Sequence, residues 1–301
     1  YNMSLYQELK ENYALSITQE EINKFVESLT TKQSEAYNDL GIQQTIFSCI
    51  DLTTLKQADS RASVKRFVEK VNQFSEDYPN YPNVGGTCVY PNFAPIVKET
   101  LKVDSVRRAV VAGGFPSSQT FIEIKAAEAK MAVRTGANEV DIVIPVGETL
   151  ENTLEEMFIQ VKAIKSIIEP IHLKVILETG VLESIDKIWY ASIAAMLAGA
   201  DFIKTSTGKE TQGDMLSAAY VMCCAIKRYK QETNRMVGFK PAGGIRTAYD
   251  ATMFYLLVDK ILGNEWLNAN YFRIGASSLA NSSLSRMETL RTGQEREIKY
   301  F

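Results

Sequence analysis

Short apolar runs recur along the chain, separated by segments whose apolar residues follow a helical spacing. The runs are residues 45–52, 86–90, 108–112, 139–144, 173–178, 201–206, 237–242 and 271–276. The gaps between them are long enough for a crossover helix and two loops, the alternation that builds a parallel sheet. Eight such units without an obvious second domain predict one closed (β/α)8 barrel, a TIM barrel. An open, doubly wound sheet is the alternative.

Two of the intervening segments show the helical pattern clearly. Residues 118–137 contain Thr120 with Glu123 three positions later, a capping-box pattern, and the helix is expected to stop at Gly136. Residues 215–230 carry an apolar stripe on one face and basic residues in the last turn, where the helix dipole favours cations. The stripe consists of Met215, Ala219, Met222, Ala225 and Ile226.

The ends of the chain lie outside the eight repeated units. Residues 1–44 predict a short helical N-terminal extension, clearest at residues 22–29, that either plugs the N-terminal face of the barrel or decorates it. Residues 45–285 form the barrel in this interpretation, and residues 286–301 form a C-terminal tail. The whole chain is therefore expected to be one domain.

Composition adds several exclusions. With 33 basic and 36 acidic residues, the chain has no broad field of one sign, so neither a nucleic acid nor an anionic membrane is expected as a partner. The apolar stretches are too short to span a bilayer, and the polar N-terminus lacks a secretory pattern. A soluble, cytoplasmic protein is the expectation.

The cysteines and the single histidine limit the chemistry further. Cys49, Cys88, Cys223 and Cys224 show no spacing typical of a disulfide framework or a zinc site. His172 is the only histidine, which excludes sites that hold a metal with several imidazoles, and it is expected to be structural or solvent-facing. Lysine and carboxylate chemistry must carry any reaction, with no metal and no cofactor.

Charged residues interrupt three of the predicted strands. In the sixth run, alternation sends Phe202, Lys204 and Ser206 to one face, so Lys204 points into the barrel or its mouth. Lys240 interrupts the next strand at the equivalent depth, and Asp141 supplies a carboxylate from a further strand. The sequence therefore predicts two ammonium groups held near one another.

A buried lysine beside a second positive charge is costly as a cation, so its pKa falls from about 10.4. A drop of roughly three units, about 4 kcal/mol, leaves a neutral amine near pH 7 that can attack a carbonyl. Alternatively, Lys204 and Lys240 are strand-end residues paired with Asp141 or Glu178. Two lysines in neighbouring strands, each followed by a glycine-bearing loop, favour the catalytic interpretation.

Three loops after the last predicted strands have the composition of a phosphate site. Glycines permit close backbone approach, while hydroxyl groups, Lys209, Arg246 and a helix expected to begin near Ser277 supply hydrogen-bond donors. In barrels of this type a phosphate site commonly lies in the loops after the last two strands. Ordinary turn chemistry would explain the glycines and serines but not Lys209 and Arg246. The loops are residues 205–209, 242–247 and 275–278.

These segments resemble a known family. Residues 201–209 (DFIKTSTGK) and 238–247 (GFKPAGGIRT) look like the two signatures of the deoxyribose-phosphate aldolases. The similarity runs from about residue 45 to about residue 285, with several motifs in the same order. The further matching stretches are residues 51–55, 88–91, 114–116, 139–141 and 272–278.

The resemblance implies a lyase that reversibly cleaves 2-deoxy-D-ribose 5-phosphate to acetaldehyde and D-glyceraldehyde 3-phosphate, without a cofactor. Lys204 would form the Schiff base, whose iminium is an electron sink for carbon–carbon cleavage. Asp141 would act as general acid and base through a water. Lys240 would depress the pKa of Lys204 and relay protons, and Asp51 would position sugar hydroxyls or balance charge near the lysine pair.

The resemblance also implies a set of substrate- and phosphate-binding residues. They are Thr53, Cys88, Thr205, Gly208, Lys209, Gly243, Gly244, Arg246, Gly275, Ser277 and Ser278. Cys88 matches a cysteine that aldehyde products can attack, although a small buried apolar role is the simpler reading. Some family members end in a tyrosine that reaches the active site, whereas here Tyr300 is followed by Phe301. The partner is a small phosphorylated sugar, and a homodimer is compatible with the family.

Three other functions fit parts of this pattern. Another Schiff-base aldolase or acyl-transfer enzyme of the same barrel group would act on a different phosphorylated sugar, but such enzymes usually place tyrosine or glutamate where Asp141 and Lys240 stand. A phosphosugar isomerase would move a proton with a carboxylate and form no covalent intermediate. A sugar-phosphate binder would bind ligand without turnover.

Overall fold

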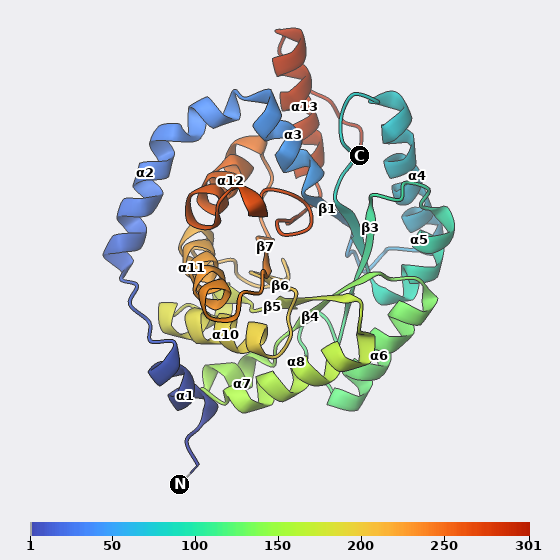
Figure 1. The fold of residues 1–301 in the computed structure, drawn as a ribbon. Coiled ribbons are helices and arrows are strands. Elements are labelled where there is room, and N and C mark those ends of the chain that lie inside the picture. The colour runs from blue at the N-terminus through green and yellow to red at the C-terminus, as the bar shows by residue number, and fades with distance from the viewer. Residues whose placement is uncertain (1) are drawn as a thin grey trace.

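The computed structural model describes residues 2–301 of the chain. Its strands form one sheet of eight strands, and helices surround this sheet (Figure 1). The strands are β1 (Ile50–Thr53), β2 (Gly86–Val89), β3 (Arg107–Ala112), β4 (Glu139–Val143), β5 (His172–Ile176), β6 (Phe202–Lys204), β7 (Gly238–Lys240) and β8 (Ile274–Ala276). Their order in the sheet is β7-β6-β5-β4-β3-β2-β1-β8. Isolated parallel bridges, Phe239 with Phe272 and Ala242 with Gly275, join β7 to β8. The predicted (β/α)8 barrel is therefore confirmed, and the open-sheet alternative is wrong.

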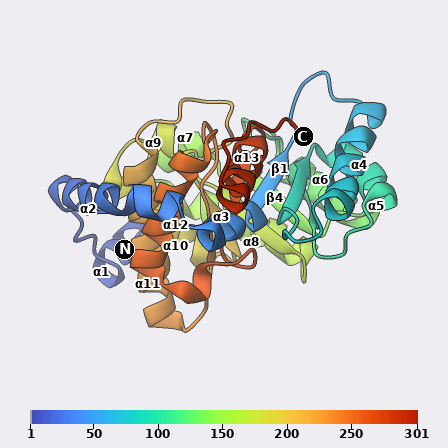
Figure 2. The same ribbon diagram turned by 90° about the horizontal axis from the view of Figure 1, so that it is seen from above.

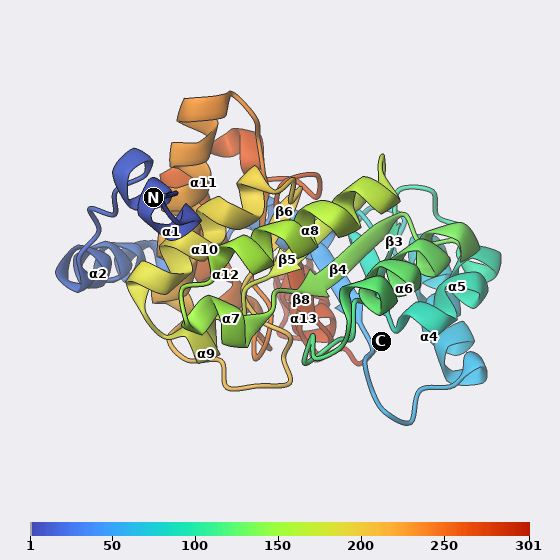
Figure 3. The ribbon, with the colours of Figure 1, turned by 90° about the horizontal axis from the view of Figure 1, so that it is seen from below.

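Helices cover the outside of the barrel (Figures 1 and 2). Those that follow β1 are α4 (Arg61–Asp77), α5 (Ala94–Thr100), α6 (Ile122–Thr135), α7 (Val146–Leu150), α8 (Leu154–Ile168), α9 (Thr179–Leu182), α10 (Ile185–Leu197), α11 (Met215–Thr233), α12 (Ala248–Leu262) and α13 (Leu279–Thr292). Two 3-10 helices, η1 (Pro91–Phe93) and η2 (Asn264–Trp266), precede α5 and β8. Neighbouring helices pack on one another, as α6 and α8 do in Figure 3. Outward strand residues such as Val140, Ile142 and Ile203 are buried beneath this ring.

The N-terminal extension lies on the outside of the helical ring. It forms α1 (Leu5–Asn12), α2 (Gln19–Tyr37) and α3 (Leu40–Ser48). Helix α2 runs along α11 and α12, α1 contacts α8 and α10, and α3 packs against α12 and α13. Both α1 and α2 begin with a complete capping box. Within residues 2–301, no helix is long and apolar enough to cross a membrane.

Two local predictions were wrong. The first predicted strand began too early, because residues 45–48 form the last turn of α3, where the apolar side chains of Ile46 and Phe47 are buried. The capping box of Thr120 and Glu123 does not form, since α6 begins after Phe121 without a side-chain cap. Other side-chain bonds hold this loop: Lys125 Nζ donates to Ser118 Oγ at 2.8 Å, and Ser118 Oγ donates to the Val143 carbonyl at 2.9 Å.

The other helix predictions agree with the structure. Helix α6 ends at Gly136, whose φ of 137° suits a glycine at this stop. Helix α11 extends three residues beyond the predicted end at Lys230. Four members of its apolar stripe are buried and Met215 is half-buried, so the stripe faces the core as expected. His172 opens β5 and is exposed, in agreement with a solvent-facing role.

Gly238, at an inward position of β7, leaves space for a large side chain in the barrel interior. A methyl group on Gly238 would overlap the ring of Phe202, which is 1% exposed and fills the barrel below Lys204. The buried side chains of Lys174 and Arg273 lie over this ring, so it has little room to move. Overpacking of this kind typically destabilises a core.

We therefore expect Gly238→Ala to lower the free energy of unfolding by about 1–3 kcal/mol, measured by urea denaturation. Gly147→Ala is the matched control, because a methyl group there meets no atom within 4 Å in helix α7. The control should be neutral or slightly stabilising. Equal effects of the two substitutions would contradict the packing argument.

Candidate active site

Seven charged side chains point into the barrel, and none is more than 4% exposed. They are Asp51, Glu139, Asp141, Lys174, Lys204, Lys240 and Arg273. Strand alternation explains the arrangement, since residues two apart share a face, as Glu139 and Asp141 do on β4. Because each strand contributes only one or two of these residues, the cluster exists only when the barrel is closed. Charges buried this deeply are tolerated when they pair with one another.

Asp141 is the centre of the cluster. Its Oδ2 accepts hydrogen bonds from Lys204 Nζ at 2.9 Å and from Lys240 Nζ at 2.8 Å. Its Oδ1 accepts from Lys174 Nζ at 2.9 Å. Lys240 Nζ also donates to Asp51 Oδ2 at 2.5 Å. The structure thus brings the two predicted lysines to the same carboxylate oxygen and places Asp51 beside them.

Glu178 does not pair with either lysine, so that part of the alternative interpretation was wrong. Its carboxylate accepts from the backbone N–H of Thr207 at 3.1 Å and from Thr207 Oγ1 at 2.7 Å. It therefore holds the loop after β6. Burial raises the pKa of Glu178, while the bonds from Thr207 act in the opposite direction.

Three members of the cluster were not identified from the sequence. Lys174 Nζ lies 2.6 Å from Glu139 Oε2, and Arg273 donates to both oxygens of Glu139 at 2.9 and 3.0 Å. Arg273 Nη1 also donates to Asp51 Oδ1 at 2.6 Å. All three lie inside predicted strands, at inward positions, so the alternation that identified Lys204 could have found them.

The pairings divide the lysines into two groups. Burial lowers the pKa of Lys204, Asp141 opposes this, and the Lys240 ammonium lowers it further, with a net decrease. Burial would also lower the pKa values of Lys174 and Lys240, but the carboxylates around them raise both. The direction expected for Lys204 is therefore confirmed. Burial alone would raise the pKa of Asp141, yet the three surrounding ammonium groups hold it well below its usual range.

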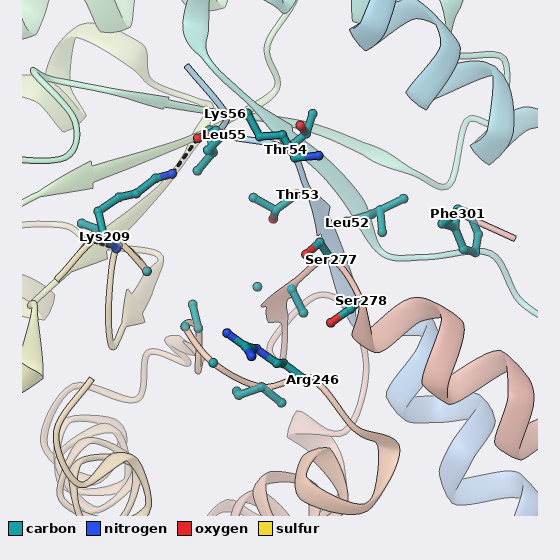
Figure 4. A pocket seen from close by; sticks show the side chains of 18 of the residues that line it. Leu52, Thr53, Thr54, Leu55, Lys56, Lys209, Arg246, Ser277, Ser278 and Phe301 are labelled. Carbon is teal, nitrogen blue, oxygen red and sulfur yellow. Dashed lines mark hydrogen bonds between the residues drawn. The ribbon is translucent and has the colours of Figure 1, made fainter. Parts of the chain in front are cut away.

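A cavity of about 570 Å³ opens at the carboxyl ends of the strands (Figure 4). Lys204 lines it, whereas Lys174 and Lys240 are fully buried and do not. Among the three lysines of the cluster, the one with the lowered pKa is thus the one that a molecule in the cavity can reach. Barrel enzymes place their chemistry at this end.

One side of the cavity has unused hydrogen-bond donors. Within residues 2–301, the backbone N–H groups of residues 243–246 and of Ser277 and Ser278 have no protein acceptor. Gly243 and Gly244 have φ values of 91° and 72°, and helix α13 begins directly after Ser278. Successive free amides and a helix N-terminus favour an anion. The side chain of Arg246 lies beside them in Figure 4.

Most of the predicted binding residues line this cavity. They are Thr53, Gly208, Lys209, Gly243, Gly244, Arg246, Gly275, Ser277 and Ser278. Lys209 reaches from the loop after β6 and donates to the carbonyl oxygen of Leu55 at 2.7 Å, the contact drawn dashed in Figure 4.

Cys88 and Thr205 are not among the residues that line the cavity. Cys88 is buried with Leu55, Ala109 and Val111 in an apolar cluster, and burial raises the pKa of its thiol. Thr205 Oγ1 donates to the Ala242 carbonyl at 3.1 Å and accepts from the Ala242 N–H at 3.0 Å. Thr205 therefore joins the loops after β6 and β7, and a direct contact with a ligand in the cavity is not supported.

The C-terminal residues lie beside the cavity and α4 (Figure 2). Phe301 lines the cavity, while the Tyr300 hydroxyl donates to Asp77 Oδ2 at 2.7 Å. Asn281 Oδ1 accepts from the backbone N–H groups of both residues at 2.9 Å. In this arrangement Tyr300 is held by α4, and its hydroxyl does not contact the lysine cluster.

Comparisons with known proteins agree with this geometry. Residues 45–279 match the family model described as DeoC/LacD family aldolase. The chain is 43% identical over 243 residues to a Caenorhabditis elegans relative, with 79% of each chain covered. It is 41% identical over 245 residues to the deoxyribose-phosphate aldolase of Mus musculus, with 76% of each chain covered. The solved deoxyribose phosphate aldolase of Aeropyrum pernix, described as tetrameric, has a TM-score of 0.63 and 25% identity, covering 86% of this chain and 97% of that one.

The row of free amides predicts binding of inorganic phosphate, measurable by isothermal titration calorimetry. We expect Gly243→Ala to weaken it by about tenfold or more, because the methyl group would overlap the Gln212 carboxamide and distort the loop. Gly263→Ala is the control, since Gly263 has the same φ of 91° but no atom within 4 Å of the added methyl. Equal losses of phosphate affinity in the two variants would mean that backbone strain alone is responsible. If the unchanged protein does not bind phosphate, the predicted anion site is wrong.

Proposed function

Because the chain belongs to the DeoC/LacD aldolase family, we propose that it reversibly cleaves 2-deoxy-D-ribose 5-phosphate to acetaldehyde and D-glyceraldehyde 3-phosphate. One observation carries the mechanism: Lys204 alone among the three lysines of the buried charge cluster lines the cavity, and its pKa is lowered. A neutral amine at the wall of a cavity is the nucleophile that a Schiff-base aldolase needs.

The reaction begins when Lys204 Nζ attacks the C1 aldehyde of the open-chain sugar. Loss of water from the adduct gives an iminium, which accepts the electron pair of the C2–C3 bond as the C3 hydroxyl loses its proton. D-Glyceraldehyde 3-phosphate leaves, and an enamine stays on Lys204. Protonation of the enamine carbon and hydrolysis of the resulting iminium release acetaldehyde and return the free amine.

We assign the proton transfers to Asp141 and Lys240. Asp141 is ionised in the resting site because the ammonium groups of Lys174 and Lys240 contact it, so it starts as the base. Its Oδ2 accepts hydrogen bonds from both Lys204 and Lys240. A proton that Asp141 takes up near Lys204 can move on when Lys240 gives one of its own protons to Asp51 and accepts one from Asp141. Asp51 holds Lys240 through its Oδ2, and we assign it a role in positioning that ammonium.

The free amides at Gly243–Arg246 and at the start of α13 support the phosphate assignment. A phosphate bound there would fix one end of the sugar while Lys204, which lines the same cavity, meets the other end. Arg246 and Lys209 add positive charge without being buried. A cytoplasmic location and a homodimer stay predictions from the sequence and the family resemblance.

Schiff-base formation is tested by incubation with 2-deoxyribose 5-phosphate and borohydride, followed by peptide mass spectrometry. We expect a reduced adduct on Lys204 and inactivation of the protein. Lys204→Leu should show no adduct and no turnover in a coupled glyceraldehyde-phosphate assay, with its fold intact by circular dichroism. No adduct on the unchanged protein would favour an isomerase if the sugar phosphate is converted, and a binding protein if it is not.

Lys240 is tested by substitution with leucine, which fills similar space without the charge. Loss of its ammonium removes a proton carrier and a positive charge beside Lys204, so we expect kcat to fall by roughly 10²–10⁴. Substrate binding should persist, measured by calorimetry, because Lys240 does not line the cavity. A variant with near-normal kcat would contradict the assigned relay.

A further inference from the structure

Below the lysine pair lies a set of charges that the cavity does not reach. We call Glu139, Lys174 and Arg273 the inner layer. Lys174 contacts Asp141 and Glu139, and Arg273 contacts Asp51 and Glu139. None of the three lines the cavity or touches Lys204, so the proposed chemistry leaves them without a role.

The buried cluster holds more positive than negative groups. Lys174, Lys204, Lys240 and Arg273 face three carboxylates, so one positive charge is in excess when every lysine is protonated. In a site shielded from water an uncompensated charge is expensive, and loss of one proton relieves it.

The contacts decide which lysine gives up that proton. Lys174 has carboxylate oxygens of Glu139, Asp141 and Asp51 at 2.6, 2.9 and 3.6 Å. Lys240 has two carboxylate partners, at 2.5 and 2.8 Å. Lys204 has one, Asp141 at 2.9 Å, which it shares with both other lysines. Lys204 is therefore the least compensated ammonium group.

Other titratable groups near the cluster contribute less to this balance. Glu178 acts on Lys204 without contacting it, because its carboxylate is bonded to Thr207. Burial raises the pKa of the Cys49 thiol near Arg273, so that thiol stays neutral. Strand β2 contributes the thiol of Cys88, and burial raises its pKa so that it stays neutral. Strand β3 presents the apolar Ala109 and Val111. Arg107 lies 4.0 Å from Glu139, but its side chain is 46% exposed and screened by solvent.

We propose that Glu139 and Arg273 are positioning residues that set the proton affinity of Lys204 from a distance, through the net charge of the buried cluster. This rests on the proposed function, because it assumes that neutral Lys204 is the nucleophile. Removing the Arg273 charge leaves the cluster without an excess positive charge, so Lys204 should keep its proton to higher pH. Removing the Glu139 charge increases the excess, so Lys204 should lose its proton at lower pH.

The test is the acid limb of the pH profile of kcat/KM for 2-deoxyribose 5-phosphate, which follows deprotonation of the nucleophile. We expect the limb to move down by about one pH unit in Glu139→Gln and up by about one unit in Arg273→Gln. At a pH below the limb, this is about a tenfold gain and a tenfold loss in kcat/KM. The double variant Glu139→Gln/Arg273→Gln restores the net charge and should return the limb to its original position.

Charge-preserving substitutions are the matched controls. Glu139→Asp and Arg273→Lys disturb packing to a similar extent but keep the charge, so any loss of activity should occur without a shift of the limb. If Arg273→Gln does not fold, Glu139→Gln and the double variant still give different expectations, a lowered limb and an unmoved limb. Shifts of both single variants in the same direction, or no shifts, would overturn the proposal.

Borohydride trapping separates this proposal from the proposed function. If the unchanged protein forms no Lys204 adduct, the Schiff-base function itself fails. If the adduct forms and the limb of Glu139→Gln stays in place, the function stands, and the inner layer has a structural role only.

Discussion

The structure depends on the compensation of seven charges that are buried inside the barrel. Each buried ion loses several kcal/mol of hydration, which the protein recovers only through short contacts with opposite charges. Because those contacts join β1, β4, β5, β6, β7 and the residue before β8, they require these strands to be in register. If one of these strands slipped by one residue, its charged side chain would turn from the barrel interior toward the helices. The cluster that performs the proposed chemistry therefore also specifies the closed barrel.

The rest of the interior is shaped around that cluster. Strands β2 and β3 present Cys88, Ala109 and Val111, which form an apolar wall opposite the charged strands. Gly86 leaves the space that Asp51 and Arg273 occupy, since a methyl group there would lie 2.6 Å from Asp51 Oδ1. An apolar wall and close packing exclude water, so the charges act on one another with little screening. This is why the pairing pattern, more than exposure, separates Lys204 from the other lysines.

The sequence predicted the secondary-structure elements better than it predicted which charged side chains pair with one another. Apolar runs found all eight strands, and alternation placed Lys204, Lys240 and Asp141 inside the barrel. The same rule applied to residues 173–178 and 271–276 would have found Lys174 and Arg273, but it could not reveal that they share Glu139. Pairing across strands depends on the register and closure of the barrel, which no local pattern encodes. The false capping box at Thr120 has a similar origin, because Ser118 and Lys125 at this loop bond to Val143 and Gln160, which are distant in the sequence.

The three buried lysines of the cluster have different numbers of carboxylate neighbours, and this gives them different roles in the site. A lysine with two or three carboxylate neighbours stays charged and can orient Asp141, whereas a lysine with one shared neighbour can be neutral and attack a carbonyl. Position in the barrel reinforces this, since the fully paired lysines are closed off and Lys204 opens to the cavity. If Lys204 were paired as well as Lys174, it would be a permanent cation with no lone pair to donate. The deficit of one carboxylate is therefore a requirement of the mechanism and not a defect in the packing.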